Sequence, residues 1–168
     1  VGTQTEIYAY LRLLFARIGA PHCPKGGKAI TRQTSQEIVE KISAFPPGSK
    51  VLILAPLVRG RKGEHRELFE KMKKDGFVRA RIDGQIHELE KPVKLDKKRT
   101  HVIEVVVDRL VLKPDIRKRL SDSVETALEA GSGIVIVSVE ALPASGERRP
   151  ADRDILFNEQ YACVDCGV

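Results

Sequence analysis

Apolar and charged side chains alternate strictly over residues 77–83, near the middle of the chain. Arg79, Arg81 and Asp83 occupy one set of alternate positions, and the positions between them are apolar. This period of two predicts a half-buried strand with one charged face. The glycine that follows Asp83 predicts a tight hairpin turn, because glycine tolerates a positive φ. A run rich in Val and Ile at 102–112 predicts the central strand of the same sheet.

Helical spacing of apolar residues and short bounded apolar runs predict the remaining elements. The helices run from a capping box at Thr3–Glu6 to Gly19, from a second box at Thr34–Glu37 to Phe45, through Leu68–Met72 to just before Gly76, and from Pro114 to Gly131. The further strands cover 51–56, 133–139 and 155–157, and 144–154 is a polar loop. This order predicts an α+β fold, with packed helices on a small mixed or antiparallel sheet. The strongly apolar first helix packs either on a larger body or on this sheet.

Composition describes a globular chain that carries a basic charge. Of its 168 residues, 42% are hydrophobic and 31% are charged, and the net charge is +6. This charge permits contact with nucleic acid or with an acidic protein and does not choose between them. Because only 5% of residues are aromatic and Trp is absent, a base-stacking platform for single strands is not expected. No apolar run reaches the roughly 20 residues that a membrane span needs. The start, VGTQTEIYAY, has neither a signal peptide pattern nor an initiator Met, which suggests an excised fragment.

Three cysteines are candidate zinc ligands. Cys163 and Cys166 form a Cys-x-x-Cys pair, in which two thiolates can reach one tetrahedral ion. Cys23 supplies a third ligand if the chain ends meet, and His22 or a residue beyond the chain supplies the fourth. Alternatively, these cysteines are free or structural, because Gly26 stands where a C-P-x-C-G knuckle has its second cysteine. Zinc catalysis is not expected, since no helix carries the required Glu and His pattern.

No motif for nucleotide binding or catalysis is complete. The segment 60–63 is basic and flanked by glycines, but it lacks the length and the Lys-Ser/Thr end of a Walker A loop. No Gly-x-Ser-x-Gly elbow surrounds a serine, and the histidines fall in predicted loops or at strand ends. We therefore do not expect this chain to be an enzyme by itself.

A charged sheet face is the best functional candidate. Arginine on a rigid strand binds carboxylates through two parallel hydrogen bonds, which gives directional recognition. The alternative is an ordinary solvated face. The mixed signs favour a protein partner over DNA. The candidate residues are Arg59, Arg61, Lys62, Arg79, Arg81, Asp83, Asp108 and Arg109. A second hypothesis assigns direct duplex DNA contact to the basic stretches 59–66 and 97–99.

Several segments in the same order resemble the UvrA family, a component of the bacterial excinuclease. They are VGTQTEIYAYLRLLFARIGAPHCP at the start, VLILAP at 51–56, VRARID at 78–83, IEVVVDRL at 103–110, RLSDSVETAL at 119–128 and LFNEQYACVDCG at 156–167. The resemblance implies a domain that binds UvrB and is inserted into the first ATPase domain of a dimeric, zinc-containing, DNA-binding ABC-class ATPase. It places an N-terminal helix and partial zinc knuckle of the ATPase body at 1–27, the UvrB-binding domain at 28–154, and the return strand and CxxC of the body at 155–168.

The resemblance also indicates which residues of the charged face are the main contacts. Arg79 and Arg109 are the expected main contacts with UvrB, and the other charged-face residues support them. ATP and magnesium are expected only in the full-length parent, because the Walker and signature motifs are absent from this segment. Gly26 departs from the family pattern, which has Cys or His at this position. The resemblance implies a location in the bacterial cytoplasm.

Overall fold

A computed structural model describes residues 2–27, 33–140 and 154–159. The chain divides into two compact units, residues 1–32 with 161–168, and residues 33–160. In the first unit, α1 (Gly2–Ile18) confirms the predicted helix. It already begins at Gly2, so Thr3 lies inside the helix and the predicted capping box there is wrong. None of the described helices is long and apolar enough to span a membrane.

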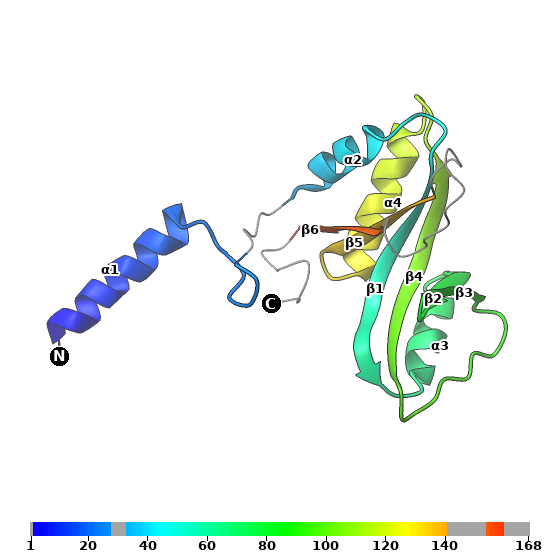
Figure 1. Ribbon diagram of the computed structural model, residues 1–168, viewed down its shortest axis with the longest axis horizontal. Helices are drawn as coiled ribbons and strands as arrows, with labels where there is room; N and C mark the ends of the chain where they lie inside the picture. Colours follow the sequence, from blue (N-terminus) through cyan, green and yellow to red (C-terminus); the bar gives the residue numbers. More distant parts are fainter. Residues whose placement is uncertain (1, 28–32, 141–153, 160–168) are drawn as a thin grey trace. The chain divides into compact units, whose positions relative to one another are not determined.

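The second unit is built on a six-stranded sheet (Figure 1). Its strand order is β3-β2-β4-β1-β5-β6, and every neighbouring pair is antiparallel, so the α+β prediction is confirmed. The strands are β1 (Lys50–Lys62), β2 (Arg79–Ile82), β3 (Gln85–Glu88), β4 (Thr100–Val111), β5 (Ile134–Glu140) and β6 (Asp154–Asn158). The helices are α2 (Ser35–Ser43), α3 (Arg66–Lys74) and α4 (Arg117–Ala130). Because β6 pairs with β5, residues 154–158 complete this sheet, whereas the predicted domain boundaries remain a prediction.

The predicted hairpin is present. β2 and β3 pair from Arg79 opposite Glu88 to Ile82 opposite Gln85, which leaves a two-residue turn. Asp83 and Gly84 have φ angles of 48° and 85°, as a primed turn requires. β4 lies between β2 and β1, so the prediction of a central strand is also confirmed.

β1 is much longer than the predicted strand at 51–56, because it continues to Lys62. Pro56 lies within it, where the pairing with β4 shifts register between Pro56 and Val58. A proline cannot donate a ladder hydrogen bond, and such irregular positions accommodate it. The basic segment after the predicted strand is therefore largely strand too.

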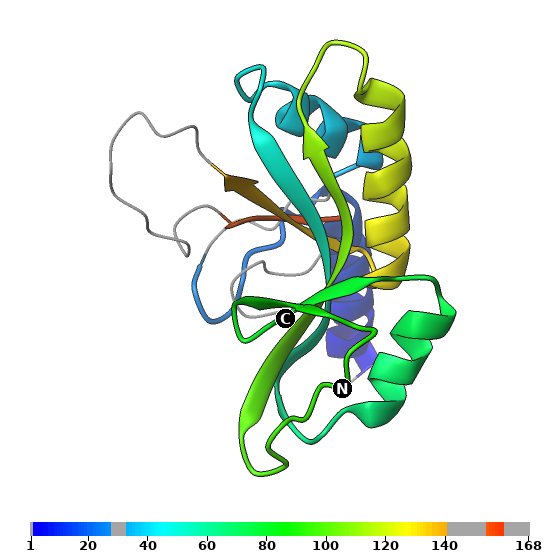
Figure 2. The ribbon, with the colours of Figure 1, turned by 90° about the vertical axis from the view of Figure 1, so that its right-hand side faces the viewer.

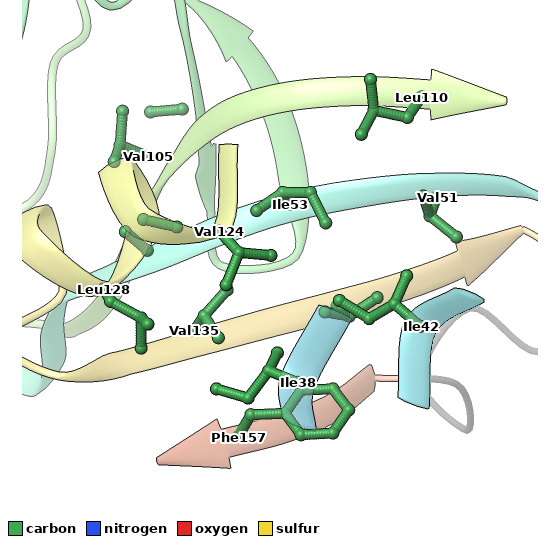
Figure 3. Packing of buried hydrophobic residues seen from close by; sticks show 14 of the residues in the cluster. Ile38, Ile42, Val51, Ile53, Val105, Leu110, Val124, Leu128, Val135 and Phe157 are labelled. Atoms are coloured by element: carbon green, nitrogen blue, oxygen red, sulfur yellow. The ribbon is translucent and has the colours of Figure 1, made fainter. Parts of the chain in front are cut away.

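The helices and one sheet face enclose the main hydrophobic core. α3 and α4 lie on the same side of the sheet (Figure 2), and α2 packs against α4. Ile38 and Ile42 of α2 meet Val124 of α4 and Ile53 of β1 in this core (Figure 3). The capping box at Thr34 is confirmed, because its hydroxyl accepts from the Glu37 N–H at 3.2 Å.

The opposite sheet face, here called the outer face, carries a second and smaller apolar cluster. Leu52 and Leu54 of β1 and Ile136 of β5 form it, and the partly buried Val106 and Leu156 pack against it. The buried residues of α2, α3 and α4 belong to the main core. The outer face is therefore the side of the sheet that these three helices leave accessible.

Candidate docking surface

A β-bulge in β4 decides which side chains reach the outer face. Ile53 pairs with Asp108, whereas the next residue of β1, Leu54, pairs with Val106. Val107 is thus an extra residue in β4, and it reverses the alternation of the side chains that follow. Asp108 consequently faces the helices, and Arg109 reaches the outer face.

The bulge brings Arg109 to the same depression as Arg79. This depression has a volume of about 530 Å³ and is lined by Leu52, Arg79, Ile86, His87, Glu88, Lys91, Val106 and Arg109. Both arginines are exposed, and they come from neighbouring strands, as the sequence predicted. Two guanidinium groups beside one open depression are suited to binding carboxylates.

Sequence reasoning missed the other six residues of the depression. Leu52 is only 8% exposed and Ile86 is 53% exposed, so apolar surface lies among the charges. Glu88 forms an ion pair with Lys91 at 3.1 Å. The hairpin register could have identified Glu88, because a two-residue turn after Ile82 places it opposite Arg79. No local pattern could have added Leu52, which depends on the pairing of β1 with β4.

Arg81 is engaged within the sheet. Its guanidinium pairs with Glu104 of β4 and donates to Asp154 of β6 at 2.6 Å and 3.1 Å. Its side chain is only 13% exposed. Burial opposes the charged form, but the hydrogen bonds to Glu104 and Asp154 outweigh burial and raise the Arg81 pKa. Arg81 therefore links three strands and does not line the depression.

Asp108 fastens α4 to the sheet and lies apart from the two exposed arginines. Its carboxylate accepts two hydrogen bonds from Arg119, at 2.8 Å and 2.9 Å, and one from the Ser123 hydroxyl at 2.9 Å. Partial burial would raise the Asp108 pKa, but the hydrogen bonds from Arg119 and Ser123 and the Arg109 N–H lower it. The expectation that Asp108 clusters with Arg109 on one face is therefore wrong.

Asp83 is likewise engaged, at the hairpin turn. Its carboxylate contacts His101 Nδ1 at 2.7 Å and accepts from the Val102 N–H at 2.9 Å. The other nitrogen of this buried histidine lies 2.9 Å from the Asp96 carbonyl oxygen. Both neighbours are acceptors, so this geometry favours the form of the ring in which both nitrogens carry protons. The hydrogen bond that the ring donates to Asp83 raises the His101 pKa accordingly.

Arg59, Arg61 and Lys62 lie at the far end of β1. Arg61 pairs with His101 and Lys62 with Thr100, whereas Arg109 lies near the other end of β4. The eight predicted residues therefore do not form one cluster. The structure brings Arg79 and Arg109 together and places the other six elsewhere.

The predicted metal ligands are only partly within the described residues. Cys23 is 3% exposed, and its Sγ accepts from the Gly26 N–H at 3.4 Å. The Gly27 N–H closes the turn on the Cys23 carbonyl at 2.8 Å. A buried sulfur that accepts an N–H bond fits the thiolate of a zinc knuckle. Cys163 and Cys166 lie outside the described residues, and within those residues no three His, Cys, Asp or Glu side chains are placed to hold a metal.

The comparisons with a family model and with known proteins agree with one another. Residues 33–141 match the family model described as the UvrA interaction domain. The chain is 51% identical to a UvrABC system protein A of Clostridium tetani and 47% identical to that of Bacillus subtilis, over 100% and 99% of its length. A relative from Methanothermobacter thermautotrophicus is 53% identical over 97% of the chain. The chain spans only 16–17% of the length of these relatives.

Proposed function

Because the chain belongs to the UvrA interaction domain family, we propose that its outer sheet face docks UvrB in nucleotide excision repair. The observation that carries the proposal is the convergence of Arg79 and Arg109 on one depression. The family resemblance supplies the identity of the partner, and the two arginines supply the chemistry that it must match. UvrB then presents carboxylates to this face.

The surroundings of the two arginines support a specific contact. Val106 lies opposite Arg79 in the sheet, and Leu52 lies opposite Arg109. When a partner covers these apolar side chains, water leaves the depression and each arginine–carboxylate pair gains strength. A rigid sheet also holds the guanidinium groups in place before binding, which reduces the entropy lost on association.

The remaining predicted contacts take different roles in this proposal. Arg81, Asp83 and Asp108 hold the domain together through their internal bonds. Arg79 and Arg109 are the principal binding residues because they line the depression, and Lys91 adds a positive charge there.

Titration calorimetry of this chain against purified UvrB tests the proposal. We expect Arg79→Ala and Arg109→Ala each to weaken binding by ~2 kcal/mol or more, which is about 30-fold. Arg→Lys at either position should recover only part of the affinity, because lysine keeps the charge but loses the forked geometry. Binding should also weaken with added salt.

Arg117→Ala is the matched control, since Arg117 is an exposed arginine on α4, outside the depression. We expect its affinity to equal that of the unmodified chain. Unchanged affinity in both Arg79→Ala and Arg109→Ala, or an equal loss in Arg117→Ala, contradicts the assignment of the binding face.

Zinc ligation by Cys23, Cys163 and Cys166 is also part of the proposal. The buried Cys23 sulfur and its bond from Gly26 support it. Bound zinc would fix the chain ends relative to each other and would take no part in catalysis. The metal content of the purified chain, compared with that of Cys23→Ser, tests this.

The remaining activities belong, in this proposal, to the parent protein. This segment recruits a partner and hydrolyses no ATP by itself. Binding of ATP, magnesium and damaged DNA, and formation of a homodimer, are assigned to a cytoplasmic UvrA of which this chain is a piece. A nucleotide hydrolysis assay on the chain alone should give no turnover above background.

A further inference from the structure

The ends of β1 and β4 extend beyond the rest of the sheet as a two-stranded ribbon. β5 pairs with β1 only up to Leu54, and β2 pairs with β4 only from Ile103 onward. The ladder between β1 and β4 continues to Lys62 opposite Thr100. In Figure 1 this part of β1 and β4 runs down to the end of the domain that lies away from α2. The turn of the β2–β3 hairpin still lies beside β4 at Val102, whose carbonyl accepts from the Asp83 N–H at 3.0 Å. Beyond this point, among the described residues, the ribbon has two strands without a third beside them.

Positive charge concentrates at this end. We define the basic ribbon tip as six exposed residues, Arg59, Arg61 and Lys62 of β1 and Lys97, Lys98 and Arg99 of the turn before β4. Within the described part of the chain, none of the six is in an ion pair. Two nearby acids have partners, since Glu64 pairs with Arg66 at 2.8 Å and Asp83 with His101, although Asp83 also attracts Arg99. The exposed Asp96 lies in the turn itself, where its carboxylate accepts from the Lys98 N–H. The six cations outnumber these acids, so the tip keeps a net positive charge.

The turn that carries three of these charges is held in place. The Asp96 carbonyl accepts from the Arg99 N–H at 3.2 Å, and the Asp96 carboxylate accepts from the Lys98 N–H at 2.9 Å. His101 lies 2.9 Å from the same carbonyl and 2.7 Å from Asp83 of the hairpin. The backbone under the lysines is therefore fixed, and binding orders mainly their side chains.

We infer that the basic ribbon tip binds the phosphate backbone of duplex DNA. Six exposed cations, which outnumber the acids beside them, supply the sequence-independent attraction that phosphates require. A two-stranded ribbon is narrow enough to enter the major groove. Neither 59–66 nor 96–101 contains Phe, Tyr or Trp, so stacking on single-stranded bases does not contribute.

This contact is separate from the proposed UvrB surface and does not rest on it. Thr100 and Arg109 lie at opposite ends of β4, about 30 Å apart at the usual rise of a strand. The tip residues do not line the depression that Arg79 and Arg109 share. One domain can therefore hold a protein at one end of the β1–β4 ribbon and DNA at the other.

Fluorescence anisotropy with a labelled duplex of about 30 base pairs tests the inference, with the salt concentration varied. The test variant replaces Lys97, Lys98 and Arg99 by Gln, which removes three charges from exposed positions. We expect duplex affinity at about 0.05 M salt to fall about tenfold or more. The slope of log affinity against log salt should become shallower by about 2.7, since three phosphate contacts are lost.

The matched control replaces Lys113, Arg117 and Lys118 by Gln. This control removes the same number of lysines and arginines, from the other end of β4. Its affinity and salt slope should match the unmodified chain, and both variants should retain the circular dichroism of the folded domain. Three outcomes overturn the inference: equal losses in both variants, no duplex binding at the lowest salt concentration, or tighter binding to a single strand of the same length.

Discussion

Replacing Asp108 by Ala should destabilise the domain, because its carboxylate accepts hydrogen bonds from both β4 and α4. The Asp108 side chain is 19% exposed and receives four hydrogen bonds. Two come from the Arg119 guanidinium, one from the Ser123 hydroxyl, and one from the Arg109 N–H at 2.8 Å. The substitution removes the single acceptor that connects these groups.

The size of the effect follows from the exposure of each partner. Arg119 is 64% exposed, so solvent screening leaves its pair with Asp108 only a small share of the total. The Ser123 hydroxyl has one proton and keeps a second acceptor, the Arg119 carbonyl at 2.8 Å, so it loses little. The bond from the Arg109 N–H dominates and contributes about 1.5–2 kcal/mol, because its acceptor is charged. From these contributions we expect the free energy of unfolding to fall by about 2 kcal/mol.

Urea denaturation followed by circular dichroism measures this loss, and thermal unfolding should shift down by about 8 °C. Asp122→Ala is the control, since Asp122 is an exposed carboxylate on the same helix. It should change stability by less than about 0.5 kcal/mol. The reasoning is refuted if Asp108→Ala loses no more stability than Asp122→Ala.

Two further predictions concern charges that the fold holds internally. The His101 pKa is raised from 6.5 and the Asp83 pKa is lowered from 3.8. The His101 contribution to stability is therefore complete below pH 6.5 and is lost as pH rises through the raised His101 pKa. The Asp83 contribution is present above pH 3.8 and is lost as pH falls through the lowered Asp83 pKa. The stability difference between the unmodified chain and His101→Asn, measured by denaturation, should be largest between these two values and should shrink as pH rises through the raised His101 pKa. A difference independent of pH excludes the charged pair. Arg81→Met should destabilise the domain by about 3 kcal/mol, since Glu104 keeps a buried charge, and adding Glu104→Gln should recover part of this loss.

Local sequence patterns were sufficient to predict most helices and strands of the second unit. The alternation at 77–83 and the Asp83-Gly84 pair predicted the β2–β3 hairpin, because turn chemistry and side-chain parity depend on neighbouring residues only. The capping box at Thr34 located the start of α2 for the same reason. The boundary of β1 was not predictable in this way. Its last four residues, 59–62, are basic apart from Gly60, and they are part of the strand because β4 pairs with them.

Local sequence patterns do not predict which side chains of β4 reach the candidate site. Simple alternation continued from Val105, which faces the core, would turn position 109 toward the helices as well. The extra residue Val107 reverses this, so Leu110 enters the core and Arg109 points outward. Nothing in the sequence of β4 marks Val107 as a bulge, because the register with Ile53 and Leu54 of β1 creates it. Side-chain chemistry gave eight charged candidates, and Arg79 and Arg109 were selected once the family resemblance was added. Their meeting on one face required this long-range pairing. The bulge thus directs Asp108 to α4 and Arg109 to the depression, so that one backbone irregularity serves both the packing of the helix and the geometry of the proposed binding face.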